Sequence, residues 1–194
     1  MASPAPSGAP GARERIMAAA AELFYANGFG AVGVDRIIAE ANVAKATLYH
    51  HFRTKDELVV AYLEQANDEF WAWIDGGVSP GADGTDLLVE IFQLIEDQAT
   101  SPTCRGCAFQ VTAAEFPDPT HPAHVAAAEH KRQALDRFAS VAADAGLDDP
   151  PGLASTLLLL MDGAWAATRM FGADNHRAGL ATTVRRLLAD HATA

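Results

Sequence analysis

The hydrophobic positions along the chain follow a helical period, and no segment shows the strict alternation of a half-buried strand. Near the N-terminus, Val34, Ile37 and Ala41 recur at intervals of three and four residues and predict a short helix. Asn42, a residue that tolerates a left-handed backbone, follows where this helix has to stop. We therefore expect a turn at 42–44 and, from the pattern as a whole, an all-α fold.

A second short helix is predicted directly after this turn, from about Lys45 to His51. It would bury Leu48 and Phe52. Four side chains, which supply hydrogen-bond donors, acceptors and one ring, then lie on or near its free face: Lys45, Thr47, Tyr49 and His50. Two short helices joined by a tight turn are a common device for aiming side chains at DNA.

A third helix start is marked by Thr54 and Glu57, which have the spacing of a capping box. The helix would begin at Lys55, and the lysine ammonium group would lie beside an exposed helix N-terminus. Because backbone N–H groups and a cation both favour negative charge, such a corner suits a phosphate.

Residues 13–63, RERIMAAAAELFYANGFGAVGVDRIIAEANVAKATLYHHFRTKDELVVAYL, resemble the N-terminal domain of TetR-type (TetR/AcrR) transcriptional regulators along their whole length. The TLYHHF segment with the following KDEL is the most specific part. The resemblance implies an all-α dimeric repressor whose second domain binds a small molecule and whose third helix lies in the major groove. It also implies the DNA contacts, with Tyr49 and Lys55 on phosphates: Lys45, Thr47, Tyr49, His50 and Lys55.

Two positions depart from the family pattern. Position 33 is usually Ser or Thr, whereas Gly33 has no hydroxyl with which to cap the helix or reach a phosphate. Position 44 is commonly a polar cap, and Ala44 cannot fill that role, at a cost of about 1 kcal/mol in helix stability. We expect one phosphate contact fewer and a third helix that is better ordered on DNA than off it.

We predict about nine helices in three segments of chain. Residues 1–11 form a disordered arm, 12–60 an N-terminal three-helix helix-turn-helix domain, and 61–194 a larger helical effector-binding and dimerisation domain. The helix from Lys55 to about Ile74 crosses this boundary and offers a route for tilting one domain when the other changes shape. A loop is expected at 76–84. The remaining helices are expected at 12–27, 86–99, 107–115, 121–145, 151–171 and 175–191.

The net charge of −11 argues at first against a nucleic-acid partner, because affinity for DNA comes largely from cations. The charges are distributed unevenly, however. Residues 1–60 contain six Lys and Arg against six Asp and Glu, whereas residues 61–194 contain eight against nineteen. An acidic body behind a near-neutral DNA-binding domain suppresses indiscriminate binding, which is compatible with a sequence-specific regulator.

The second domain is rich in aromatic residues. Most aromatics at helical spacing are core residues, yet a helical domain with many flat side chains can also enclose an apolar cavity. We expect a small apolar or aromatic effector, with these residues on the cavity wall: Phe70, Trp73, Phe92, Phe109 and Trp165. His130, His176 and His191 look like helix-surface residues.

The last two predicted helices carry apolar stripes beside small residues. The stripes are Leu157, Leu160, Ala164 and Thr168 on one helix and Leu180, Val184, Leu187 and Leu188 on the other. They could serve the core of a single subunit. The family resemblance implies instead that these helices pair with those of a second copy, and a dimer is required to bind a palindromic operator in double-stranded DNA.

Cys104 and Cys107, with His121 and His124, approach zinc-finger spacing, but the second pair is one residue short of the usual interval. Structural cysteines are the leading interpretation, and a redox pair or a zinc site stays open as an alternative. A thiol- or metal-dependent helical enzyme is a third possibility. Against it, the chain contains no nucleophile elbow, phosphate loop, HExxH or dinucleotide fingerprint. We predict no enzyme, no catalytic residue, no cofactor and no resident metal.

Composition supplies the last expectations. No run approaches the roughly 20 apolar residues of a membrane span. The first residues lack the basic start and apolar stretch of a signal peptide. With only two cysteines, a disulfide framework is not indicated. The sequence therefore predicts a cytoplasmic, ligand-responsive DNA-binding regulator with no membrane partner, and a repressor is the main hypothesis.

Overall fold

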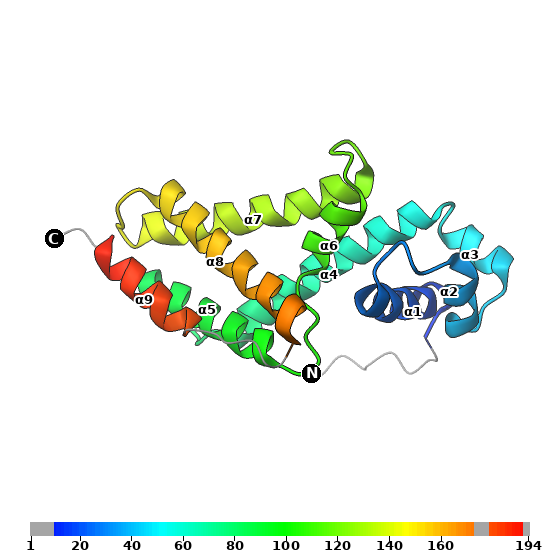
Figure 1. Cartoon of the computed structure of the whole chain (residues 1–194), viewed down its shortest axis with the longest axis horizontal. Helices are drawn as coiled ribbons and strands as arrows, with labels where there is room; N and C mark the ends of the chain where they lie inside the picture. The colour runs from blue at the N-terminus through cyan, green and yellow to red at the C-terminus, as the bar shows by residue number, and fades with distance from the viewer. Residues whose placement is uncertain (1–9, 173–178, 192–194) are drawn as a thin grey trace, which may run out of the picture. The chain divides into compact units, whose positions relative to one another are not determined.

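The computed structural model describes residues 10–172 and 179–191, and all regular structure within those ranges is α-helical (Figure 1). Its helices are α1 (Ala12–Asn27), α2 (Val34–Ala41), α3 (Lys45–His51), α4 (Lys55–Gly77), α5 (Gly84–Thr100), α6 (Ala108–Glu115), α7 (Pro122–Asp144), α8 (Pro150–Phe171) and α9 (Leu180–Asp190). The all-α prediction is confirmed. In these ranges no helix combines the length and apolarity needed to cross a membrane. The predicted N-terminal arm lies mostly outside the described residues.

The chain divides into two compact units, and the second begins at Leu63. The core of the first unit is built by α1, α2, α3 and the beginning of α4. An aromatic group closes it: the ring of Phe24 lies 5.1 Å from that of Phe29 and 5.7 Å from that of Tyr62. Ile16 and Ile37 are fully buried with this group. Because α2 and α3 are too short to be stable alone, these contacts hold them in place.

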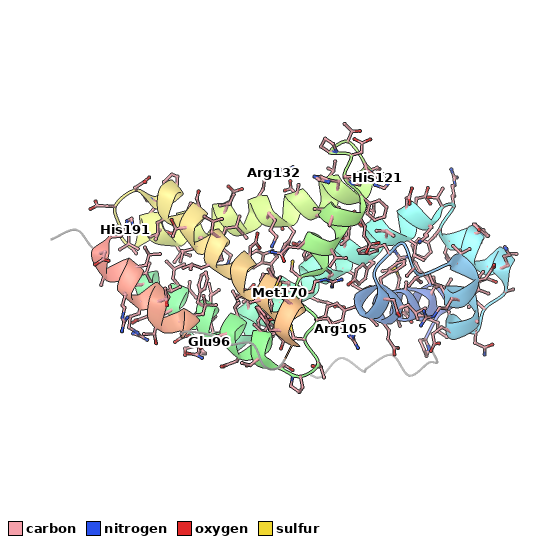
Figure 2. The ribbon with its side chains drawn as sticks, in the orientation of Figure 1. Glu96, Arg105, His121, Arg132, Met170 and His191 are labelled. Carbon is pink, nitrogen blue, oxygen red and sulfur yellow. The ribbon has the colours of Figure 1, made fainter. Side chains whose placement is uncertain are left out.

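The second unit is a bundle in which α5 packs against α7, α8 and α9 (Figure 1). Phe92 on α5 and Phe138 on α7 are completely buried, with ring centroids 5.5 Å apart. A polar contact supports the start of α9, where the Glu96 carboxylate accepts a hydrogen bond of 2.9 Å from the Ala181 N–H. Glu96, labelled in Figure 2, therefore satisfies from α5 one of the backbone groups that the first turn of α9 leaves unpaired.

The predicted loop at 76–84 is too long. Helix α4 continues to Gly77, and α5 already begins at Gly84. A Cβ atom at position 77 would lie 2.7 Å from Cδ1 of Leu94, so this glycine allows close packing against α5. The glycine-rich composition predicts a turn here, but in the structure Gly77 belongs to α4 and packs against Leu94 of α5. Helix α9 starts at Leu180, later than expected, and residues 173–178 lie outside the described ranges.

Candidate nucleic-acid interface

The connection between α2 and α3 is the tight turn that the sequence predicts. Asn42 adopts a left-handed conformation with φ 50° and ψ 54°. The Val43 N–H then donates to the Ile38 carbonyl at 3.3 Å and closes the C-terminal end of α2. Ala44 is extended, and α3 begins at the next residue. This left-handed residue redirects the chain within three positions, which sets α3 at an angle to α2.

The orientation of α3 is fixed by its apolar residues. Leu48 and Phe52 are buried, and the Arg13 guanidinium group lies 5.3 Å from the centre of the Phe52 ring. At about 100° per residue, the side opposite Leu48 is centred on Ala46 and His50, and Tyr49 lies beside them. These residues are exposed. The predicted exposure of Tyr49 and His50 is thus what the structure has, whereas Thr47 lies at the margin and is half-buried.

Lys45, at the first position of α3, is exposed and forms an ion pair of 3.2 Å with Asp35 on α2. Both partners are solvated, so the pair contributes at most about 1 kcal/mol to stability. The pair does, however, keep the ammonium group at the α2–α3 junction. A stronger anion such as a phosphate competes readily with an exposed carboxylate of this kind.

Lys55 is held differently. It is half-buried, and its ammonium group donates a hydrogen bond of 2.5 Å to the Phe29 carbonyl. The cap predicted beside it is present, since the Glu57 N–H donates to the Thr54 hydroxyl at 3.1 Å. The Glu57 carboxylate accepts a hydrogen bond from the Arg53 N–H at 2.7 Å. Lys55 is therefore a structural as well as a cationic residue, because an ammonium group has donors left after one bond.

The two positions that depart from the family pattern, 33 and 44, lack a side-chain cap, as the sequence predicts. Gly33 and Ala44 occupy the N-cap positions of α2 and α3, and neither provides a side-chain hydrogen bond. Nothing lies within 4 Å of the place where a Cβ of residue 33 would stand. Both helix starts thus carry backbone N–H groups without a side-chain cap.

Sequence reasoning left out two residues of α3 that the structure exposes. Ala46 lies at the centre of the free face, where a methyl group can contact the methyl group of thymine. His51 is exposed, and its ring centroid lies 5.2 Å from that of His50. The signal was available in the helical rotation, because Ala46 and His50 are four residues apart on the side opposite Leu48.

The five aromatic residues predicted to line an effector cavity do not all lie together. Phe70 on α4 has its ring centroid 5.7 Å from Trp73 and 5.1 Å from His130 of α7. Phe109 on α6 stacks on the His130 ring, and the two ring centroids are 3.7 Å apart. Phe92 pairs with Phe138 in the bundle core instead. We call Phe70, Trp73, Phe109 and His130 the aromatic cluster.

Trp165 is the fifth predicted cavity residue. It is buried on α8, and its backbone carbonyl lies against the α5–α6 loop at Gly106. No ring contact links it to the aromatic cluster among the interactions described for residues 10–172 and 179–191. The structure therefore supports a narrower grouping than the sequence suggested.

The expectation that His130 lies on a helix surface is wrong. Its side chain is 3% exposed, and Nδ1 lies 2.8 Å from Oδ1 of Asn67. Burial, helped by the nearby charge of Lys131, lowers the pKa of His130 to about 3, so the ring is neutral at physiological pH. The spacing contained the signal, because Ala127, His130 and Ala134 fall on one buried stripe of α7. His176 lies outside the described residues, and His191 contacts the Asp148 carbonyl at 3.1 Å.

The cysteines and histidines do not converge on a metal site. His121 caps α7 by accepting from the Ala123 N–H at 3.2 Å, and Nδ1 of His124 lies 2.8 Å from the Phe116 carbonyl. In the part of the chain that the structure describes, no three Cys, His, Asp or Glu side chains group as metal ligands. The zinc alternative has no support from this geometry.

The apolar stripes of the last two helices face the core of their own subunit. Leu157, Ala164 and Thr168 of α8 are buried, as are Val184 and Leu188 of α9. The other members of the predicted stripes are half-buried: Leu160, Leu180 and Leu187. The opposite face of α8 is exposed instead and consists of apolar and small residues: Leu159, Gly163, Ala166 and Met170. We call these four residues the α8 face. Leu159 is 73% and Met170 76% exposed.

Comparison with known proteins extends these observations. Residues 16–62 match the family model described as bacterial regulatory proteins, tetR family. The structure is similar to that of SCO4454, a TetR-family transcriptional regulator from Streptomyces coelicolor, with a TM-score of 0.85 and 36% sequence identity. That similarity covers 94% of this chain and 96% of SCO4454.

Curated relatives match over a shorter stretch. The chain is 34% identical over 83 residues to the transcriptional regulator AcuR of Cereibacter sphaeroides, which is 39% of this chain and 38% of AcuR. It is 41% identical over 56 residues to the transcriptional activator FasR of Mycolicibacterium smegmatis, covering 29% of this chain and 26% of FasR. The chain thus spans well under half the length of these two relatives. Because SCO4454 matches over nearly its full length, the chain belongs to the TetR family of transcriptional regulators, which are not enzymes.

Proposed function

We propose that the protein is a repressor that binds operator DNA as a homodimer in the cytoplasm and leaves it when a small apolar or aromatic effector binds the second unit. The free face of α3 carries the DNA-binding part of this proposal. It combines a cation, a phenol and an imidazole with a buried anchor, Leu48, that holds them outward. A recognition helix needs this combination, since base edges are contacted by polar groups on a rigid element.

Lys45, Thr47 and His50 are proposed to face base edges, and Tyr49 and Lys55 to contact phosphates. The hydrogen bond from Lys55 to the Phe29 carbonyl supports a positioning role, because it aims the ammonium group before DNA arrives. The absence of a hydroxyl at Gly33 removes one phosphate contact that a serine would supply. The proposed interface therefore relies more on α3 and Lys55 than on the start of α2.

Dimerisation is proposed to use α8 together with α9. The support is the α8 face, whose two large members, Leu159 and Met170, are among the most exposed apolar side chains described. The space beside Gly163 is open, so a second helix can approach closely at the middle of this face. Burying exposed apolar side chains of this size stabilises association by about 1.5–3 kcal/mol each.

The effector is proposed to bind at the aromatic cluster. Flat rings from α4, α6 and α7 meet there around a neutral imidazole, and Trp71 adds a further ring 4.9 Å from Phe70. Aromatic ligands stack on such rings, while the Asn67 and His130 side chains offer polar contacts. Phe92 is not part of the proposal because it fills the bundle core.

Selection of duplexes from a random-sequence pool tests DNA binding directly. Enrichment of a palindrome with half-sites one helical turn apart is expected, and the protein should bind it at least about 100-fold more tightly than a shuffled duplex at physiological salt. Fluorescence anisotropy between 50 and 200 mM salt should show affinity falling with salt. Enrichment of no sequence, or equal affinity for both duplexes, would refute the proposal.

Tryptophan emission offers a test of the effector site, because Trp71 and Trp73 lie next to Phe70. Titration with a panel of aromatic compounds should identify ligands that change this emission and release the selected duplex. Phe109→Ala should weaken the response to such ligands while leaving DNA affinity unchanged. A ligand that releases DNA equally well from the Phe109→Ala variant would place the effector elsewhere.

A further inference from the structure

The loop between α5 and α6 contains two cysteines that the DNA-binding function does not use. Cys104 and Cys107 are separated by Arg105 and Gly106, and no disulfide joins them in the structure. Their surfaces are 8% and 9% exposed, so solvent reaches them only narrowly. Gly106, which lies between the two cysteines, has a φ of 85°, a left-handed conformation that glycine adopts readily. Two residues between cysteines is the spacing of many reversible disulfides.

A lysine from another helix lies against one of these thiols. The ammonium group of Lys131, on α7, donates to Sγ of Cys107 at 3.6 Å and to Oδ1 of Asp162 at 2.5 Å. A cation in this position stabilises the negative charge that sulfur carries while it acts as a nucleophile. The carboxylate of Asp162, on α8, holds the half-buried lysine in place. Cys107 thus has a feature of a reactive thiol that burial alone does not provide.

We propose that Cys107 and Cys104 form a peroxide-oxidisable dithiol, with Cys107 as the attacking and Cys104 as the resolving cysteine. The sulfur of Cys107 attacks one oxygen of a hydroperoxide: an S–O bond forms, the O–O bond breaks, and the leaving oxygen departs with the thiol proton as water or an alcohol. The Cys104 sulfur then attacks the Cys107 sulfenic acid, an S–S bond forms, the S–O bond breaks, and water leaves. The sulfurs lose two electrons, and the peroxide gains them.

Narrow access to the thiols favours a small oxidant over a bulky electrophile. Hydrogen peroxide is little larger than water and fits an opening that exposes less than a tenth of each cysteine. A large alkylating reagent does not fit such an opening unless the surrounding structure moves. The dithiol is therefore expected to react with peroxide before it reacts with bulky maleimides.

Closing the disulfide changes a loop that is packed on α8. A Cβ at position 106 would lie 2.7 Å from the Trp165 carbonyl oxygen, and the Arg169 side chain donates to the Arg105 carbonyl at 3.4 Å. Arg105 and Met170, both labelled in Figure 2, lie at the same end of α8. Cys107 also directly precedes α6, and its backbone carbonyl accepts a hydrogen bond of 3.3 Å from the Val111 N–H. Movement of this loop is thus transmitted to α6 and α8.

The regulatory consequence rests on the proposed function, because α8 carries the face proposed for dimerisation. A disulfide that shifts α8 changes the spacing of the two α3 helices in the dimer and lowers operator affinity. The thiol chemistry itself does not depend on DNA binding. The two claims can therefore fail separately.

The test exposes the full-length protein to hydrogen peroxide without DNA and follows its mass and its reactive thiols. Wild type should lose about 2 Da and both thiols, and a reductant should restore them. Lys131→Met should react about 10-fold more slowly. Arg132→Met, which removes a neighbouring exposed cation from the same helix, should keep the wild-type rate.

Circular dichroism establishes that each variant is folded before its rate is compared. The proposal is overturned if the wild-type thiols persist, if Cys107 is over-oxidised without forming the disulfide, or if Lys131→Met reacts as fast as wild type. A duplex-binding assay on reduced and oxidised protein is run separately. Disulfide formation with unchanged operator affinity would retain the dithiol and remove its regulatory role, whereas reduced protein that never binds DNA would refute only the proposed function.

Discussion

The two units distribute polar and apolar side chains in opposite ways. Among the described residues, the first unit exposes a polar face on α3, and its buried side chains are apolar apart from the phenol of Tyr62. The second unit buries Thr112, His130 and Thr168, and it leaves large apolar residues such as Leu159 and Met170 in solvent. Tyr49 is the large hydrophobic residue exposed in the first unit, and it carries a hydroxyl.

The different distribution of polar and apolar side chains suits the two units to different kinds of binding partner. A surface of cations, phenol and imidazole suits a polyanion, because each such group can contact phosphates or base edges. An exposed apolar helix face suits another protein surface, because covering it removes apolar area from water. Buried polar groups need a specific partner in the interior, and Thr112, His130 and Thr168 have theirs in the Ala108 carbonyl, the Asn67 side chain and the Ala99 carbonyl.

The largest effect is expected from Leu159→Glu, which places a charge at one end of the α8 face. A carboxylate cannot be buried between two apolar helices without a partner, so the dimer should dissociate. Operator affinity should fall by about 100-fold or more, because each monomer then binds a single half-site. Light scattering coupled to gel filtration, together with anisotropy, measures both quantities.

Val125→Glu is the matched control for this change. Val125 is an exposed apolar residue of α7, outside the α8 face. It should leave both the dimer and DNA binding unchanged. Dissociation by Val125→Glu and not by Leu159→Glu would move the interface from α8 to α7.

A second effect follows from the neutral, buried His130. The folded state resists protonation of this ring because its pKa is lowered from 6.5 to about 3, whereas the unfolded chain binds the proton readily. Its contribution to stability is therefore complete above about pH 6.5 and is lost as the pH falls towards 3, by about 1.4 kcal/mol per pH unit. His130→Gln should remove this component from the pH dependence of unfolding by urea.

The corresponding control is His50→Gln, which alters an exposed histidine of α3. Its unfolding should follow the wild-type pH dependence. If wild type and His130→Gln lose stability in parallel between pH 7 and pH 5, the histidine is not held neutral by the fold.

Lys45→Ala tests the polar face of α3 with a smaller expected effect. Loss of this cation should weaken specific DNA binding by about 1–3 kcal/mol, while the exposed ion pair with Asp35 makes the stability change small. Arg132→Ala removes an equal charge from an exposed pair in the second unit and should not alter DNA binding. Equal losses in the two variants would mean that net charge, and not α3, determines affinity.

The smallest effect, a gain, is expected from Ala44→Ser. Residue 44 has the extended backbone of an N-cap, with φ −74° and ψ 151°, but no side-chain hydrogen bond. A serine hydroxyl there should raise the free energy of unfolding by about 0.5–1 kcal/mol. Gly33→Ser should add only a few tenths, because glycine already caps through its backbone. A lower melting temperature for Ala44→Ser would show that α3 does not start as described.

The sequence by itself determined the helices of the first unit. Asn42, the Thr54–Glu57 cap and the spacing of Val34, Ile37 and Ala41 are local signals, and local signals act through the backbone of neighbouring residues. The bounds of α1, α2 and α3 accordingly coincide with those predicted. The exposed face of α3 followed from the same rotation that buries Leu48.

Only the tertiary structure decided which side of each long helix faces inward. Leu157 and Leu159 are both apolar, and a single sequence does not reveal that the first packs in the core and the second lies in solvent. The same limit applies to the pairing of Phe92 with Phe138, the burial of His130 beside Asn67, and the approach of Lys131 to Cys107. These contacts join residues 24 to 63 positions apart or depend on helix rotation within the bundle, so they are set by packing and not by local propensity.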